Sequence, residues 1–200
     1  PKTVRRQRQM CIRDRLKDYL PNINKKFKNF NFSGLAFNSK EVKKNYIFIA
    51  IKGDRFDGNN YINDAIKNGA KIIISSKFKD QIKNNVLYLK QKNPRQILSN
   101  LSSQIFKKKP QNLIAVTGTN GKTSIANFYY QILKKNKKKV ASFGTLGISG
   151  KKKIENTSNT TFDPIKIGKN LNYLEKKKIN NVILEAVSYT HLRAHETSGY

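Results

Sequence analysis

Residues 114–131, with the sequence IAVTGTNGKTSIANFYYQ, bring together an apolar run, two glycines, a lysine and adjacent hydroxyl side chains. The apolar residues before Gly118 predict a strand, and the pattern after Gly121 predicts a helix. A loop between a strand and a helix start directs unpaired backbone N–H groups at one point, where the helix dipole also attracts an anion. The spacing departs from the usual G-x-x-x-x-G-K-[ST] pattern, because position 116 is valine. The stretch predicts a phosphate-binding loop, with a plain strand-to-helix turn as the alternative.

The residue types in this loop suit a nucleoside triphosphate. Gly118 and Gly121 permit backbone angles and a close approach that a Cβ would obstruct. Lys122 can reach the β- and γ-phosphate oxygens, and Thr123 can offer its hydroxyl to Mg²⁺. Ser124 is a further donor to phosphate.

A second candidate is Glu185, which follows the apolar residues 182–184. An acid at the carboxyl end of a buried parallel strand lies where a P-loop enzyme needs another Mg²⁺ ligand. Position alone equally allows an ordinary solvated glutamate at the end of a strand.

The elements that position these residues are expected to alternate as in an α/β protein. Apolar runs rich in β-branched residues predict strands, and apolar residues at helical spacing predict helices. The first half is expected to contain strand 46–51, helix 60–70, strands 71–75 and 86–89, and helix 94–106. The second half is expected to contain buried strand 113–117, helix 122–135, strand 140–144, a loop at 145–163, helix 164–177 and buried strand 181–185.

A polar, proline-containing break at 107–112, KKKPQN, separates the two halves. We expect a small N-terminal α/β domain at 16–108. Residues 109–186 are expected to form the first part of a P-loop-type domain with a parallel sheet, truncated at its C-terminal side.

Both ends of the chain differ in composition from the middle. The only Cys, the only Met, both His and six of the eight Arg lie within residues 1–15 or 187–200. The segments RRQRQMCIRDR and VSYTHLRAHETS resemble translated sequencing-adapter sequence. We therefore treat both ends as non-native tails and give their Cys and His no functional role, genuine basic tails being the alternative.

The formal net charge of +29 comes from 41 Lys and Arg against 12 acidic residues. Much of the lysine lies in short clusters, which are expected in loops and at helix ends, where basic side chains are solvated. A Lys- and Asn-biased composition explains the charge, and a polyanion-binding face is the alternative. The clusters lie at 107–109, 134–139, 151–153 and 176–178.

Composition also bears on the compartment. No apolar run approaches the roughly 18 residues of a membrane span. The basic start lacks an apolar stretch of signal-peptide length. A single cysteine cannot form an internal disulfide, which fits a cytoplasmic protein.

Several segments, in the same order along the chain, resemble one enzyme family. VTGTNGKTS at 116–124 resembles the phosphate loop of the Mur ligase and folylpolyglutamate synthase superfamily of ATP-dependent amide-forming enzymes. Residues 39–76 are similar to the N-terminal UDP-binding domain of the MurE and MurF ligases. Further segments resemble the MurE type, the UDP-N-acetylmuramoyl-tripeptide synthetases: LKDYL at 16–20, ASFGTLG at 141–147, NTSNTTFDP at 156–164 and ILEA at 183–186.

The resemblance implies a cytoplasmic, monomeric ligase of peptidoglycan precursor synthesis that uses ATP and Mg²⁺. Its substrate would be UDP-N-acetylmuramoyl-L-alanyl-D-glutamate, whose D-glutamate side-chain carboxylate is phosphorylated by ATP. The amine of a diamino acid then attacks the acyl phosphate, and phosphate leaves. Neither a nucleic-acid partner nor a membrane span is expected.

The resemblance also implies roles for individual residues. ATP would be held by Gly118, Thr119, Asn120, Gly121, Lys122, Thr123 and Ser124, with Lys122 as the catalytic residue. Mg²⁺ would be bound by Thr123 and Glu185. The uridine diphosphate would contact Phe37, Ser39, Asp54, Arg55 and Phe56, and the muramoyl-peptide would contact Asn159, Thr160 and Thr161. The alternatives are a core position for Phe37, an exposed loop pair at 54–55 and a polar turn at 159–161.

The chain departs from the family pattern after Ala186, where EAVSYTH stands in place of the family's E-[AV]-S-S-H. His191 is therefore not assigned to the family histidine. The family's carbamylated lysine, the rest of its ATP-binding domain and its amine-selecting domain have no counterpart, so the chain is expected to be inactive alone. Two other functions stay open: a MurF-type ligase, and a basic P-loop ATPase that binds nucleic acid.

Overall fold

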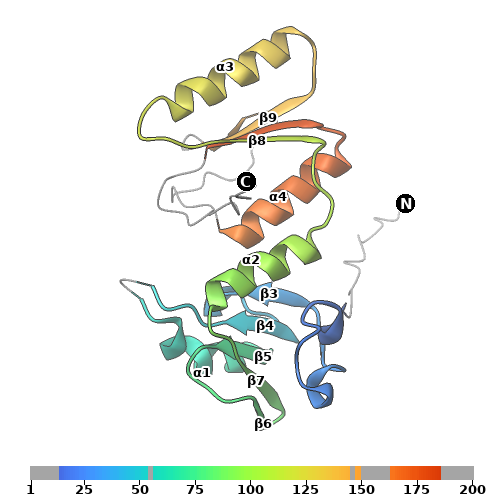
Figure 1. Cartoon of the computed structure of the whole chain (residues 1–200), viewed down its shortest axis with the longest axis vertical. Coiled ribbons are helices and arrows are strands. Elements are labelled where there is room, and N and C mark those ends of the chain that lie inside the picture. The colour runs from blue at the N-terminus through green and yellow to red at the C-terminus, as the bar shows by residue number, and fades with distance from the viewer. Residues whose placement is uncertain (1–13, 54–55, 145–146, 150–162, 186–200) are drawn as a thin grey trace, which may run out of the picture. The chain divides into compact units, whose positions relative to one another are not determined.

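A computed structural model describes residues 14–53, 56–144, 147–149 and 163–185 (Figure 1). The chain forms two compact units, residues 1–104 and 105–200. Both are α/β, as the sequence predicts, and each is described by itself below.

Unit 1 is built on a five-stranded sheet with the strand order β3-β4-β5-β7-β6. The first four strands in this order are parallel, and β6 runs antiparallel to β7. The strands are β3 (Gly34–Ala36), β4 (Tyr46–Ile49), β5 (Ala70–Ser75), β6 (Gln81–Lys83) and β7 (Val86–Lys90). The α-helices are α1 (Ile62–Lys67) and α2 (Pro94–Ile105). A short antiparallel pair, β1 (Asp14–Arg15) with β2 (Asn31–Phe32), and the 3-10 turns η1 (Leu16–Asp18), η2 (Lys25–Phe27), η3 (Ser39–Glu41) and η4 (Gly58–Tyr61) complete it.

The core of unit 1 follows from its apolar runs. The central strand β5 buries Ile72, Ile73 and Ile74 completely, as expected for a parallel strand covered on both faces. The predicted helix at 60–70 is shorter than expected, because its start is the 3-10 turn η4. The helix ends at Lys67 with the cap Asn68, and the next residue, Gly69, has a φ of 106° in the left-handed region that favours glycine.

Unit 2 contains a four-stranded sheet with the order β10-β9-β11-β8. Strands β8, β9 and β11 are parallel, and β10 runs antiparallel to β9. The strands are β8 (Asn112–Val116), β9 (Val140–Gly144), β10 (Gly147–Ser149) and β11 (Asn181–Glu185), and the helices are α3 (Lys122–Lys135) and α4 (Pro164–Lys176). Helix α4 starts with Pro164 after the N-cap Asp163, whose carboxylate accepts a 2.7 Å hydrogen bond from the Ile165 N–H.

Two details of unit 2 correct the sequence analysis. Strand β10 lies within the segment predicted to be a loop. Strand β8 was expected to be buried, yet Leu113 and Ile114 are 39% and 40% exposed. The reason is that β8 pairs only with β11 among the described residues, while α3 packs mainly against β9 and β11. Strand β11, between two neighbours, buries Val182 and Ile183 as predicted.

Candidate phosphate- and metal-binding site

The loop between β8 and α3 has a backbone that requires glycine at two positions. Gly118 has a φ of 147° and Gly121, the N-cap of α3, has a φ of 78°. Residues with a Cβ rarely adopt such φ values, whereas glycine adopts them without strain. A Cβ at Gly121 would meet no atom within 4 Å, so backbone conformation rather than lack of space explains this glycine.

The amides of the loop are available to a ligand. Residues 119–121 are exposed. Within the described part of the chain, the backbone N–H groups of Thr119 and Asn120 donate to no protein acceptor. The first N–H groups of α3 are unpaired as at any helix start, since the first turn closes with the 3.0 Å bond from Ile125 N–H to the Gly121 carbonyl. Donors from the loop and the helix start can therefore converge on an anion.

Lys122 folds back over this loop. Its Nζ donates to the carbonyl oxygens of Gly118 and, at 3.1 Å, of Thr119. The ammonium group thus places positive charge beside the loop. Because the lysine side chain is flexible, a small rotation would move the ammonium group from these carbonyl oxygens to the oxygens of a bound phosphate.

Thr123 and Glu185 meet at the carboxyl end of the sheet. The Thr123 hydroxyl donates a 3.1 Å hydrogen bond to Oε2 of Glu185. The contact arises because α3 packs on β9 and β11, and because β11 runs parallel to β8 and ends level with it. Glu185 is only 7% exposed, so it is not the solvated strand-end glutamate of the alternative reading.

These two side chains have the chemistry of a magnesium site. Hydroxyl and carboxylate oxygens are ligands that Mg²⁺ prefers, and proteins often hold this ion with one or two carboxylates plus substrate phosphates. Within residues 14–53, 56–144, 147–149 and 163–185, no three His, Cys or acidic side chains form a metal cluster. The donor set fits a cation completed by a nucleotide rather than one enclosed by protein.

The residues expected to contact the uridine nucleotide lie in unit 1. Phe37 follows β3 and is half-buried, so the simple core alternative does not describe it fully. Ser39 begins η3 and is buried, and the Asn68 amide donates a 2.9 Å bond to its carbonyl. Phe56 is 71% exposed. Asp54 and Arg55 lie outside the described residues, as do the muramoyl-peptide candidates Asn159, Thr160 and Thr161.

A polar network around Asp57, one residue after Phe56, is a further feature of unit 1 that was not predicted from the sequence. The Asp57 carboxylate accepts from the Asn59 N–H at 2.9 Å and from Lys77 Nζ at 2.8 Å. Asn59 in turn accepts a 2.6 Å bond from the Ser75 hydroxyl. The Lys77 ammonium and the Asn59 donors hold the pKa of Asp57 well below its usual range. An Asp followed by Gly-Asn before a helix was the signal that could have identified this turn.

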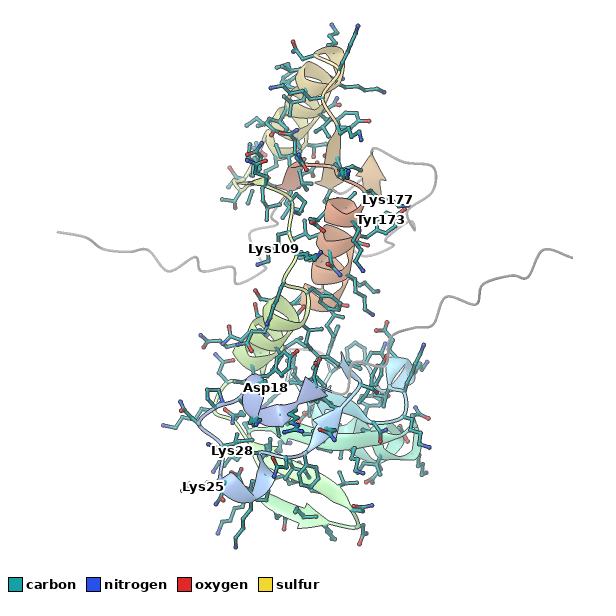
Figure 2. The ribbon with its side chains drawn as sticks, turned by 90° about the vertical axis from the view of Figure 1, so that its right-hand side faces the viewer. Asp18, Lys25, Lys28, Lys109, Tyr173 and Lys177 are labelled. Carbon is teal, nitrogen blue, oxygen red and sulfur yellow. The ribbon has the colours of Figure 1, made fainter. Side chains whose placement is uncertain are left out.

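Three of the four lysine clusters lie away from the phosphate loop, and the fourth, at 151–153, lies outside the described residues. The clusters at 107–109, 134–139 and 176–178 each precede a parallel strand, β8, β9 or β11, so they gather at the amino edge of the sheet. Their lysines are exposed. Figure 2 shows Tyr173 and Lys177 at the C-terminal end of α4, and the Lys177 Nζ lies 5.7 Å from the ring centroid of Tyr173. We call this edge the lysine rim. Most lysines in the described part of unit 2 are therefore not part of the phosphate site.

Among the helices in the described part of the chain, none has the length and apolar character needed to cross a membrane.

Three parallel strands, a glycine loop at their carboxyl edge and a helix that starts at the loop define an α/β fold of the P-loop type. Comparison with known sequences specifies the family. The Mur ligase family catalytic domain matches residues 31–111, and the Mur ligase middle domain matches residues 116–200, a range that includes the segment set apart above as a C-terminal tail. The chain belongs to the Mur ligase family.

Individual relatives agree with this assignment. The UDP-N-acetylmuramoyl-L-alanyl-D-glutamate–2,6-diaminopimelate ligase of Rickettsia prowazekii is 39% identical over 84% of this chain and 35% of its own length. A solved diaminopimelate ligase structure of the same name is 25% identical, with a TM-score of 0.68 over 88% of this chain and 36% of that one. The MurF ligase of Thermotoga maritima, solved with ADP, is 28% identical, with a TM-score of 0.52 over 76% of this chain and 31% of that one. The chain thus spans about a third of the length of these relatives.

Proposed function

We propose that this chain is the nucleotide-binding portion of an ATP-dependent ligase that adds a diamino acid to UDP-N-acetylmuramoyl-L-alanyl-D-glutamate. In this proposal unit 1 binds the uridine diphosphate of the substrate, and unit 2 binds ATP with Mg²⁺. The complete enzyme is a monomer of the cytoplasm that acts in peptidoglycan precursor synthesis. The observation that carries the proposal is the Gly118–Ser124 loop with Thr123 hydrogen-bonded to Glu185, in a chain of the Mur ligase family.

The chemistry needs an activated acid. A carboxylate is a poor electrophile, so one of its oxygens attacks the γ-phosphorus of ATP and ADP leaves, giving an acyl phosphate. The amine then attacks the acyl carbon, and inorganic phosphate leaves with the former carboxylate oxygen. Mg²⁺, which Thr123 and Glu185 would hold, would supply neutralisation of the negative charge on the phosphates.

The residues of this chain serve that reaction by positioning and by electrostatics. The amides of the loop and of the start of α3 orient the phosphates. The Lys122 ammonium leaves its carbonyl partners to neutralise charge on the transferred group. Thr123 and Glu185 hold the cation beside the loop.

The same proposal assigns Phe37, Ser39 and the 54–56 loop to the uridine diphosphate, and residues 159–161 to the muramoyl-peptide. In unit 1, Phe56 and the network around Asp57 support this assignment, because an exposed aromatic ring stands immediately before an aspartate held by two hydrogen-bond partners. Diaminopimelate ligases among the relatives support a diamino acid as the second substrate.

The test is binding by the full 200-residue chain, measured calorimetrically. We expect ATP to bind more tightly with Mg²⁺ than with a chelator, and UDP-N-acetylmuramoyl-L-alanyl-D-glutamate to bind independently of ATP. A chain that is folded but binds neither ligand would contradict the proposal. A preference for the tripeptide-bearing UDP precursor over the dipeptide would instead favour a MurF-type ligase.

The lysine rim favours a second candidate, a P-loop ATPase that binds nucleic acid. Contacts between lysines and phosphates weaken steeply as salt rises, because counterions are released on binding. Retention of single- or double-stranded DNA at physiological salt, with ATP affinity increased by the DNA, would support this candidate. Retention that disappears at physiological salt and leaves ATP binding unchanged would identify the rim as a solvated surface.

A further inference from the structure

Gly144 is the last residue of β9 and lies beside Glu185, the last residue of β11. The parallel register pairs Phe143 with Leu184, so residues 144 and 185 are the next pair along the strands. Side chains of neighbouring residues in such a pair extend from the same face of the sheet. A Cβ added to Gly144 would overlap the carboxylate carbon and Oε1 of Glu185 and would lie 2.9 Å from its Oε2.

The backbone does not explain this glycine. Its φ lies outside the left-handed region, so any residue could adopt its conformation. The three atoms nearest to the added Cβ all belong to the Glu185 carboxylate. Other glycines of the chain differ: at Gly58 the obstacle is backbone of Ile51 and Ala50, and at Gly121 the obstacle is φ.

We propose that Gly144 is a positioning residue: the space left by its missing side chain is where the Glu185 carboxylate lies when it meets Thr123. The buried carboxylate has little freedom, since it is 7% exposed and bonded to the Thr123 hydroxyl at 3.1 Å. The inference rests on the proposed function, because it assigns Gly144 a part in placing the metal-binding carboxylate.

An alanine at this position has a specific consequence. The obstructed group is the far end of a flexible side chain, so the carboxylate can turn away while both strands keep their places. The carboxylate is then displaced from the Thr123 hydroxyl. Loss of a group that orients a metal ligand typically weakens metal binding by about 10- to 100-fold.

A double-mutant cycle on the full 200-residue chain tests this inference. The four proteins are the unmodified chain, Gly144→Ala, Glu185→Ala and the double variant. Two quantities are measured for each: the affinity for Mn²⁺ in the presence of ATP, by electron paramagnetic resonance, and the free energy of unfolding in urea. Ser142→Ala, on the same strand two residues earlier, controls for general disturbance of β9.

We expect Gly144→Ala to weaken Mn²⁺ binding about 10- to 100-fold in the unmodified chain and to have no further effect in the Glu185→Ala background. There the new methyl group enters the space that the carboxylate has left, so the double variant should be at least as stable as Glu185→Ala alone. Equal losses in both backgrounds would overturn the inference, because they would mean that the backbone itself requires glycine.

The experiment distinguishes failure of the proposed function from failure of the role proposed for Gly144. If the unmodified chain binds no divalent cation with ATP, the metal role in the proposed function fails. The unfolding cycle still decides the role of Gly144: coupling between positions 144 and 185 supports the spatial relationship, and additive effects exclude it.

Discussion

The hydroxyl of Thr123 and the carboxylate of Glu185 lie 3.1 Å apart, although 62 positions separate them in the sequence. One is in the first turn of α3 and the other ends β11. If Thr123 and Glu185 bind one cation, Thr123 contributes its hydroxyl oxygen, and its methyl group plays no part in binding.

Thr123→Ser should therefore preserve the Mg²⁺-dependent part of ATP binding, whereas Thr123→Val should weaken it by at least about tenfold. Valine has nearly the same shape as threonine, so the comparison isolates the oxygen. Calorimetric titration with ATP, with and without Mg²⁺, measures the difference. Equal affinities for the two variants would exclude the hydroxyl as a ligand.

Lys122→Ala should weaken ATP binding by the value of a charge-assisted hydrogen bond, about 1.5–3 kcal/mol. This corresponds to a dissociation constant roughly 10- to 150-fold higher. The matched control is Lys134→Ala, which removes the same charge from the last turn of the same helix, where it lies 5.6 Å from the Tyr130 ring. If both variants lose affinity equally, the effect is one of net charge.

In a complete ligase that contains this chain, Lys122→Ala should abolish acyl phosphate formation and leave binding of the UDP-substrate largely intact. The uridine diphosphate is assigned to unit 1 and ATP to unit 2, so the phosphate contacts of ATP can be lost while those of the uridine diphosphate remain. Exchange of labelled ADP into ATP, dependent on the UDP-substrate and measured without the amine, reports the first step. Turnover close to that of the unmodified enzyme would refute the role of Lys122.

Acid should loosen the turn that Asp57 anchors. The Lys77 ammonium and the Asn59 donors depress the pKa of Asp57, so its ionised form is stabilised by folding. The contribution is fully present above the unfolded pKa of about 4, and it is lost as pH falls toward the depressed folded value. Thermal melting at a series of pH values should show a smaller acid-induced decrease for Asp57→Asn than for the unmodified chain.

The control for this pH series is Asp64→Asn, in the first turn of α1. Asp64 is exposed, and its carboxylate makes no hydrogen bond or ion pair among the described residues. Its replacement should leave the acid-induced decrease unchanged. If both variants flatten the profile, general charge repulsion rather than the Asp57 network governs it.

Truncation to alanine should reduce stability strongly at one phenylalanine of unit 2 and hardly at all at another. Phe143 is fully buried, so Phe143→Ala should cost about 3–5 kcal/mol of unfolding free energy. Phe128 is 62% exposed on α3, so Phe128→Ala should change it by less than about 0.5 kcal/mol. Urea denaturation measures both. A large loss for Phe128→Ala that disappears on dilution would show that a second copy of the chain covers this ring.

Local pattern predicted much of unit 2. Helix 122–135 and strands 140–144 and 181–185 have the predicted bounds, because each is a continuous apolar or amphipathic run with clear limits. The bounds of the two domains, and the ligand that each site residue binds, stay predictions.

What pattern did not predict depends on partners distant in sequence. The exposure of β8 follows from its position at an edge, and strand order cannot be deduced from the apolar run at 113–117. The contact between Gly144 and Glu185 depends on the register between two strands, and the Ser75–Asn59 bond joins different elements. Each is fixed by tertiary packing, which outweighs local preference.

The common direction of β8, β9 and β11 has a practical consequence. Lysines cluster where these strands begin, and the loop and carboxylate lie where they end. A negatively charged bead would therefore tend to bind unit 2 through the lysine rim and leave the carboxyl edge of the sheet exposed to solvent. An immobilised layer prepared in this way would present the Gly118–Ser124 turns in a shared orientation, and no engineered tag would be needed.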